Sequence, residues 1–167
     1  KETVIYLKGG VEDQFMSNDG GKTLEMIKRF SLASMKGEKT LSYKLAPAVT
    51  IDNLNKIKVF EGEREIKVTS LSSLGYASGT GSIEVAESFD LSKSYTLEID
   101  GYGSKTVIPM EIFDSKYFAD NYHYDGKDLG AVIDGSSTTF KVWAPTASRV
   151  VINLFEKGHE VAAYKSV

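Results

Sequence analysis

The 167-residue chain has the composition of a globular protein, with 41% hydrophobic, 26% charged and 11% aromatic residues. This apolar content is enough for one sizeable core or two small ones, and it argues against a disordered chain or a fibre. The 20 Lys and Arg residues stand against 23 Asp and Glu residues without long runs of either sign. The sequence therefore lacks the basic patch that binding to nucleic acid requires.

Cysteine is absent, which excludes a disulfide framework, a thiolate zinc site and a cysteine nucleophile. No stretch approaches the ~18 consecutive apolar residues that would span a bilayer. The start, Lys1-Glu2-Thr3, has neither an initiating Met nor the pattern of a signal peptide, so we expect a trimmed beginning. The lack of thiols is compatible with export and slightly favours a secreted or cell-envelope location over a cytoplasmic one.

Short alternating apolar runs, separated by turn residues, predict an all-β fold. The predicted strands lie near Val4 to Lys8, Leu41 to Leu45, Lys56 to Phe60, Glu65 to Thr69, Ser82 to Ala86, Tyr95 to Ile99, Thr106 to Glu111, Thr138 to Ala144 and Arg149 to Phe155. Tight turns with positive φ are predicted at Asp19-Gly20, Gly62, Asp100-Gly101, Asp125-Gly126 and Asp134-Gly135.

Two segments need separate interpretation. The stretch from Lys22 to Met35 fits either an alternating strand or a helix, and we favour a strand pair that turns at Lys36-Gly37-Glu38. The Ser- and Gly-rich stretch from Ser70 to Ser82 has the composition of a loop.

We predict three parts along the chain. Residues 1–112 should form an immunoglobulin-like β-sandwich, residues 113–125 an aromatic connector, and residues 126–167 the first strands of a second β-sandwich. The boundary follows from the alternating run that ends at Ile112 and the polar, aromatic-rich segment that comes after it. Half a sandwich leaves strand edges unpaired, so we expect self-association or disorder near the C-terminus.

The last third of the chain contains a recognisable motif. It includes Asp128-Leu129-Gly130 followed by Thr138-Thr139-Phe140-Lys141-Val142-Trp143-Ala144-Pro145-Thr146-Ala147-Ser148-Arg149-Val150. This pattern resembles the start of the family 48 carbohydrate-binding module of type I pullulanases, bacterial enzymes that hydrolyse α-1,6 linkages in pullulan and starch-derived dextrins. The match is strong over roughly residues 113 to 155, weaker from about 50 to 112, and essentially absent before that.

The resemblance implies that the chain is a non-catalytic, N-terminal fragment of a pullulanase-type glycoside hydrolase. The family's catalytic (β/α)8 barrel follows such a region, and the motifs of that barrel do not occur in this sequence. The implied partners are α-glucans, such as pullulan, starch or glycogen-type dextrins, and the catalytic barrel of the parent chain. No cofactor, catalytic residue or metal site is implied.

Three aromatic residues are the candidates for carbohydrate binding, because sugar rings stack on flat aromatic faces. Tyr76 lies inside the Ser/Gly loop, Tyr102 lies between two glycines, and Trp143 belongs to the motif. Packing within a strand is the favoured interpretation of Trp143, since an indole buries a large area in any sandwich, and stacking on a sugar is the alternative. An irregular calcium site at Asp120, Asp125 or Asp128 remains a less favoured alternative.

Two other functions fit the same sequence. The chain could belong to a bacterial surface protein that uses immunoglobulin-like domains as an adhesion or scaffold module. Another debranching or branching enzyme could also carry a family 48 module at this position. The Tyr122-His123-Tyr124-Asp125-Gly126 segment favours the pullulanase interpretation over the latter.

Overall fold

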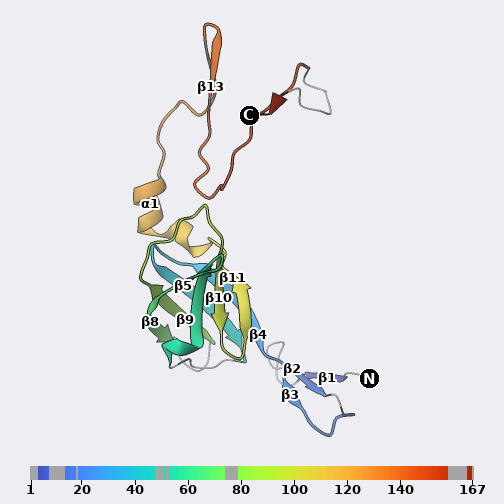
Figure 1. Cartoon of the computed structure of the whole chain (residues 1–167). Helices are drawn as coiled ribbons and strands as arrows, with labels where there is room; N and C mark the ends of the chain where they lie inside the picture. Colours follow the sequence, from blue (N-terminus) through green and yellow to red (C-terminus); the bar gives the residue numbers. More distant parts are fainter. Residues whose placement is uncertain are drawn as a thin grey trace. The chain divides into compact units, whose positions relative to one another are not determined.

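The computed structural model describes residues 4–7, 14–17, 19–47, 51, 53–73, 79–157 and 165–166. The chain divides into two compact units, residues 1–90 with 94–124 and residues 125–167 with 91–93. Strands dominate both units, and the described residues contain a single short α-helix, which confirms the predicted all-β class (Figure 1).

The first unit is built on two four-stranded antiparallel sheets. Sheet I contains, in spatial order, β11 (Gly103–Thr106), β10 (Tyr95–Ile99), β6 (Ile57–Glu61) and β7 (Arg64–Ile66). Sheet II contains β4 (Arg29–Met35), β5 (Thr40–Ala46), β9 (Thr80–Val85) and β8 (Val68–Ser73). Figure 1 shows the labelled strands of both sheets within this unit.

The core of the first unit lies between the two sheets. Strands β5, β6, β9 and β10 bury alternate residues, as expected for a sheet with one apolar face. Sheet I contributes Ile57, Val59, Ile66, Tyr95, Leu97 and Ile99, and sheet II contributes Ala33, Met35, Leu41, Tyr43, Leu45, Ile83 and Val85. All of these residues are at most 4% exposed, so both sheets contribute to one buried apolar interior.

The chain passes from sheet I to sheet II at two places. Lys67 separates β7 in sheet I from β8 in sheet II. Later, Val107 donates its N–H to Tyr95 O in sheet I at 2.9 Å, and the next residue, Ile108, forms an isolated parallel bridge with Ser34 in sheet II. Ile108 donates to Ala33 O at 3.0 Å, and its carbonyl accepts from Met35 N at 2.9 Å. The end of the sandwich is therefore hydrogen-bonded to both sheets.

A tyrosine at the start of β10 fixes the loop that precedes it. Tyr95 is 2% exposed, its hydroxyl accepts the Asp90 N–H at 2.9 Å, and its ring meets Phe89 edge-to-face at 5.0 Å. A tyrosine that bonds the backbone a few residues upstream is similar to the tyrosine corner of immunoglobulin-like sandwiches.

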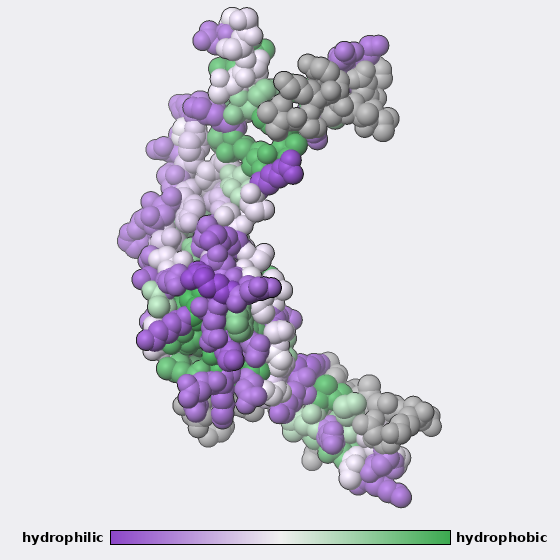
Figure 2. Space-filling model, in the orientation of Figure 1, coloured by the Kyte–Doolittle hydropathy of each residue, from purple (hydrophilic) through white to green (hydrophobic). Residues whose placement is uncertain are grey.

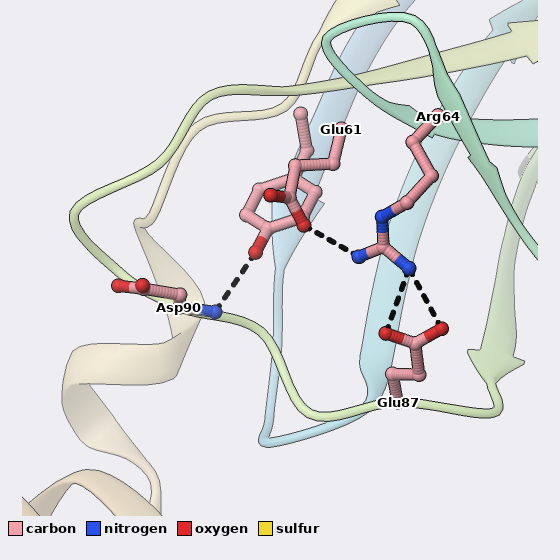
Figure 3. Close-up of polar contacts among 5 residues, drawn as sticks. Glu61, Arg64, Glu87 and Asp90 are labelled. Atoms are coloured by element: carbon pink, nitrogen blue, oxygen red, sulfur yellow. Dashed lines mark hydrogen bonds and ion pairs between the residues drawn. The ribbon is translucent and has the colours of Figure 1, made fainter.

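An ion-pair network at the surface joins the β6–β7 hairpin of sheet I to the loop that follows β9 (Figure 3). Arg64 Nη1 contacts both carboxylate oxygens of Glu87 at 2.9 Å, and Arg64 Nη2 contacts Glu61 at 2.7 Å. The hydrogen bonds to Glu61 and then to Glu87 raise the pKa of Arg64 above its ordinary value. Because Arg64 and Glu87 are half exposed, such pairs contribute little to stability individually. Arg64 nevertheless binds carboxylates on two segments and so links the loop after β9 to the β6–β7 turn.

The sandwich is followed by a helical segment. The 3-10 turn η2 (Glu111–Asp114) buries Ile112, and the helix α1 (Lys116–Tyr122) follows it. Ser115 caps this helix, since its Oγ accepts the Phe118 N–H at 3.1 Å. The segment is therefore a capped helix, whereas the sequence analysis predicts only an aromatic connector.

A small sheet precedes the sandwich and consists of β1 (Val4–Leu7), β2 (Gln14–Ser17) and β3 (Glu25–Met26). The turn after β2 is organised by Asp19, whose carboxylate accepts from Thr23 N at 2.9 Å, Thr23 Oγ1 at 2.7 Å, Ser17 Oγ at 2.8 Å and Lys22 N at 2.9 Å. These bonds, led by the one from the Thr23 backbone, lower the pKa of Asp19 to about 2.

The second unit contains a hairpin of β12 (Gly130–Asp134) and β13 (Ser137–Lys141), and a short pair of β14 (Asn153–Leu154) and β15 (Lys165–Ser166). Gly135 takes the positive φ (+58°) that the hairpin turn needs. Every residue of β12 and β13 is exposed. The hairpin is thus a two-stranded sheet without a covered face among the described residues.

Several local predictions are confirmed. Strand β10 has the predicted bounds, and β4 and β5 are joined by the turn predicted at Lys36-Gly37-Glu38. Positive φ occurs as predicted at Gly20, Gly62, Gly101 and Gly135.

Other local predictions are wrong. The strand predicted from Thr106 to Glu111 is replaced by the crossing at Ile108, because Pro109 has no N–H with which to continue a ladder. The strand predicted from Arg149 to Phe155 is reduced to the two residues of β14. Gly126 does not have the predicted positive φ. Strands β2 and β12 form where the sequence predicts no strand. The predicted loop from Ser70 to Ser82 contains the end of β8 and the start of β9.

We predict that Gly81→Ala destabilises the sandwich. A methyl group at Gly81 would lie 2.3 Å from Tyr43 Oη and 2.5 Å from its Cζ, so the buried ring must move. Overpacking of this kind typically costs about 1–3 kcal/mol, measurable as a lower urea midpoint. Gly37→Ala is the matched control, because its nearest neighbour would be 3.7 Å away. Equal midpoints for the two variants would contradict the prediction.

We predict opposite effects for two buried tyrosines. Tyr43 is 1% exposed, its hydroxyl has no hydrogen-bond partner among the described residues, and burial raises its pKa. Tyr43→Phe should therefore leave the free energy of unfolding unchanged or raise it by about 1 kcal/mol. Tyr95→Phe removes the acceptor of Asp90 N–H and should lower that free energy by about 1–2 kcal/mol. A loss of stability in Tyr43→Phe as large as that in Tyr95→Phe would contradict the prediction for Tyr43.

We predict an acid transition confined to the Asp19 turn. Because folding lowers the pKa of Asp19, its bonds are complete above the ordinary value of 3.8 and are lost as the pH falls through about 2. A carboxyl carbon titration by NMR should give this midpoint, and the Lys22 and Thr23 amide signals should move with it. In Asp19→Asn, those amide signals should not follow this transition. A midpoint near 3.8 would contradict the proposed bonding.

Candidate carbohydrate-binding residues

Tyr102 lies in the β10–β11 turn of the first unit, between Gly101 and Gly103, which both have positive φ. Its hydroxyl donates to Pro47 O at 3.0 Å, and Lys28 Nζ lies 5.5 Å from the ring centroid. Burial raises the pKa of Tyr102, so the phenol stays neutral. The ring is partly buried, and the Lys28 ammonium already occupies one of its faces in a cation–π contact. At most one face of Tyr102 is left for stacking on a sugar.

Trp143 lies just after β13 in the second unit, and it is the single tryptophan of the chain. Its side chain is 46% exposed, so a large part of the indole is accessible. The neighbouring Val142 and Val150 are 62% and 50% exposed. Figure 2 shows apolar side chains gathered at the base of the hairpin and on the segment after it. The placement of Trp143 is compatible with a stacking role.

A hollow of about 630 Å3 lies in the second unit between the hairpin and the segment that follows. Its lining is mainly apolar and includes Ala131, Phe140, Val142, Val150 and Ile152, with Lys141 as its charged member. Lys141 forms an ion pair with Asp128, which holds the start of β12 against the end of β13. The hollow is large enough for a small ligand.

The predicted residues do not form one site. Tyr76 lies outside the described residues. Tyr102 belongs to the first unit and Trp143 to the second. Each therefore has to be considered as a separate contact for a ligand.

The structure also reveals an aromatic cluster around α1 that the sequence analysis does not separate from the connector. Phe113 and Phe118 meet edge-to-face at 5.0 Å, Phe118 and Tyr122 stack at 5.1 Å, and Tyr117 meets Tyr122 at 6.1 Å. Burial, followed by the hydrogen bond with Tyr122, raises the pKa of Tyr117. The signal available in the sequence was Ser115 as a cap with aromatic residues four apart at 118 and 122.

Metal binding and membrane crossing were both searched for in the described part of the chain. No group of three or more His, Asp or Glu side chains is arranged there to hold a metal ion. The helices of that part are too short or too polar to cross a membrane. Asp120, considered above as a calcium ligand, instead forms an ion pair with Lys116 on α1.

No protein-family model matches the chain. Comparison with solved structures does find similar folds, among them several pullulanases. The pullulanase from Bacillus acidopullulyticus matches 83% of this chain with a TM-score of 0.70 and 16% identity. The Group B Streptococcus pullulanase SAP, solved in complex with maltotetraose, matches 83% with a TM-score of 0.63 and 16% identity. An Anoxybacillus pullulanase, solved with maltotriose, matches 72% with a TM-score of 0.53 and 26% identity.

These matches relate the fold of this chain to a part of pullulanase chains. The chain spans 30% of the Bacillus acidopullulyticus pullulanase chain and 18% of each of the other two. It therefore corresponds to less than a third of these enzymes.

Proposed function

We propose that this chain is a non-catalytic, N-terminal part of a pullulanase-type enzyme that hydrolyses α-1,6-glucosidic linkages in pullulan and starch. The observation that carries the proposal is the structural match to pullulanases over 83% of the chain. It agrees with the resemblance of residues 113–155 to the pullulanase connector and module. The motif lies in the order of the residues and the fold match in the arrangement of the strands, and both support the proposal.

The proposed organisation keeps the three parts predicted from the sequence. Residues 1–112 are the N-terminal sandwich domain, residues 113–125 the connector, and residues 126–167 part of a family 48 carbohydrate-binding module. The β12–β13 hairpin supports the last assignment, because it carries the Asp-Leu-Gly turn at its start and leads directly into the Val-Trp-Ala-Pro motif.

The proposed mechanism is positional. The buried core of the sandwich, its double hydrogen bonding at Ile108 and the capped helix α1 give a unit that can act as a rigid spacer beside a catalytic barrel. An α-glucan is the proposed ligand. Two of the similar pullulanases were solved with α-glucan oligosaccharides, and this chain exposes aromatic surface at Trp143.

The alternative function, an immunoglobulin-like adhesion or scaffold module, is not favoured. The sandwich itself is compatible with it, since one fold serves many functions. However, the solved structures reported above are pullulanases, and none is an adhesion protein. The alternative therefore rests on the fold class alone.

We predict that the chain is retarded in native gels that contain amylopectin or pullulan, and that it releases no reducing sugar from either. Trp143→Ala should weaken retardation by about tenfold in apparent Kd, which corresponds to about 1.4 kcal/mol, while Trp143→Phe should retain most of it. Phe155→Ala is the control, because Phe155 is an equally exposed aromatic residue of the same unit at 45%. Tyr102→Ala tests the second candidate in the same gels.

The gel experiment has two outcomes that contradict the proposal. Equal migration of the wild-type chain with and without glucan would remove the binding role and leave only the spacer role. Release of maltotriose from pullulan by the chain would show that it is not a non-catalytic part.

A further inference from the structure

A groove lies at the corner where the chain passes from sheet I to sheet II. It has a volume of about 530 Å3 and lies between the 3-10 turn η1 (Leu54–Lys56) and strands β6, β7 and β8. Leu54 and Val68 supply apolar lining, and Asn55, Lys58, Glu65 and Lys67 supply polar lining. The groove is thus apolar and polar in similar measure.

The polar groups of this corner groove are available to a ligand. Lys58, Glu65 and Lys67 are exposed, and none of them forms an ion pair or side-chain hydrogen bond with the residues that the structure describes. Lysine ammonium groups donate hydrogen bonds, the Glu65 carboxylate accepts them, and the Asn55 amide does both. Donors and acceptors on one groove match the hydroxyl groups of a sugar, each of which donates and accepts.

An aromatic side chain lies next to these groups on the outer face of sheet I. Ile57 and Val59 of β6 are buried, so Lys58 and Phe60 point to the opposite face. Glu65 on β7 and Thr96 on β10 are the cross-strand partners of Phe60 on its two sides. Lys58, Glu65 and Thr96 are therefore the neighbours of Phe60 on this face. Phe60 itself is partly exposed.

The charges around the groove nearly cancel. Lys58 and Lys67 are balanced by Glu65 and by Glu98, the cross-strand partner of Lys58 on β10. A site selective for an anion would carry an excess of positive charge, and a site for a cation an excess of carboxylates. A balanced rim beside an aromatic ring favours a neutral, hydroxyl-rich ligand.

We propose that the corner groove and Phe60 form a binding site for an α-glucan oligosaccharide, separate from Tyr102 and Trp143. One sugar ring stacks on Phe60, and its neighbours along the oligosaccharide bond to Lys58, Glu65 and Lys67 in the groove. The volume lies within the ~300–1,000 Å3 of typical small-ligand sites. This inference rests on the proposed function, because it names the part of the first unit that contacts the glucan.

The test is an NMR titration of the full 15N-labelled chain with maltotetraose. We expect the backbone amide signals of residues 58, 60, 65 and 67 to shift. Phe60→Leu, which keeps an apolar side chain without a flat ring, should raise the Kd about tenfold, and Phe60→Tyr should leave it nearly unchanged. Glu65→Gln should raise the Kd several-fold, whereas Glu63→Gln, in the adjoining turn and outside the groove lining, should not change it. Thermal unfolding curves of the variants establish that each is folded.

The outcomes separate this inference from the proposed function. Shifts confined to residues 130–152, with no effect of Phe60→Leu, would overturn the groove and leave α-glucan binding intact. No shift anywhere would overturn both the groove and the binding role. Shifts of the same four amide signals by inorganic phosphate but not by maltotetraose would identify an anion site and overturn the inference.

Discussion

Burial of the two inner sheet faces against each other is the constraint on which the first unit depends. Alternation along each strand supplies one apolar face, and the crossing points at Lys67 and Ile108 bring the faces of the two sheets together. The fit is close enough that the Tyr43 ring occupies the space a side chain at Gly81 would need. Because the interior is filled in this way, the polar and aromatic residues open to ligands are left on the outer faces and at the corners.

The sequence predicts those elements whose signal is local. The alternation of Tyr95 to Ile99 is complete, and β10 has the predicted bounds. The alternating run that contains Val107 and Ile108 predicts a single strand, although their hydrogen bonds go to two different sheets, which no local pattern reveals. Phe60 was overlooked for a related reason. Its exposure follows from register with Glu65 and Thr96, and register is set by the whole sheet.

The two units expose different surfaces. The second exposes Trp143 and an apolar hollow, while the first presents hydrogen-bonding groups in its corner groove, with Phe60 beside them on the same face of sheet I. Tyr102 shows that a position between two glycines does not by itself identify a residue that can stack on a sugar. The Lys28 ammonium lies over one face of its ring. Accessible ring faces, rather than aromatic residues as such, determine where a sugar can stack.

The hydrogen bonds at Ile108 have a mechanical consequence. Ser34 and Ile108 are paired in parallel, and they lie near the first and last strands of the sandwich. Tension applied between the two ends of this unit therefore pulls the segments past each other along their length, and the bonds from Ile108 N to Ala33 O and from Met35 N to Ile108 O must break together. A sandwich joined in this shear geometry resists stretching better than one whose outermost strands peel apart one bond at a time.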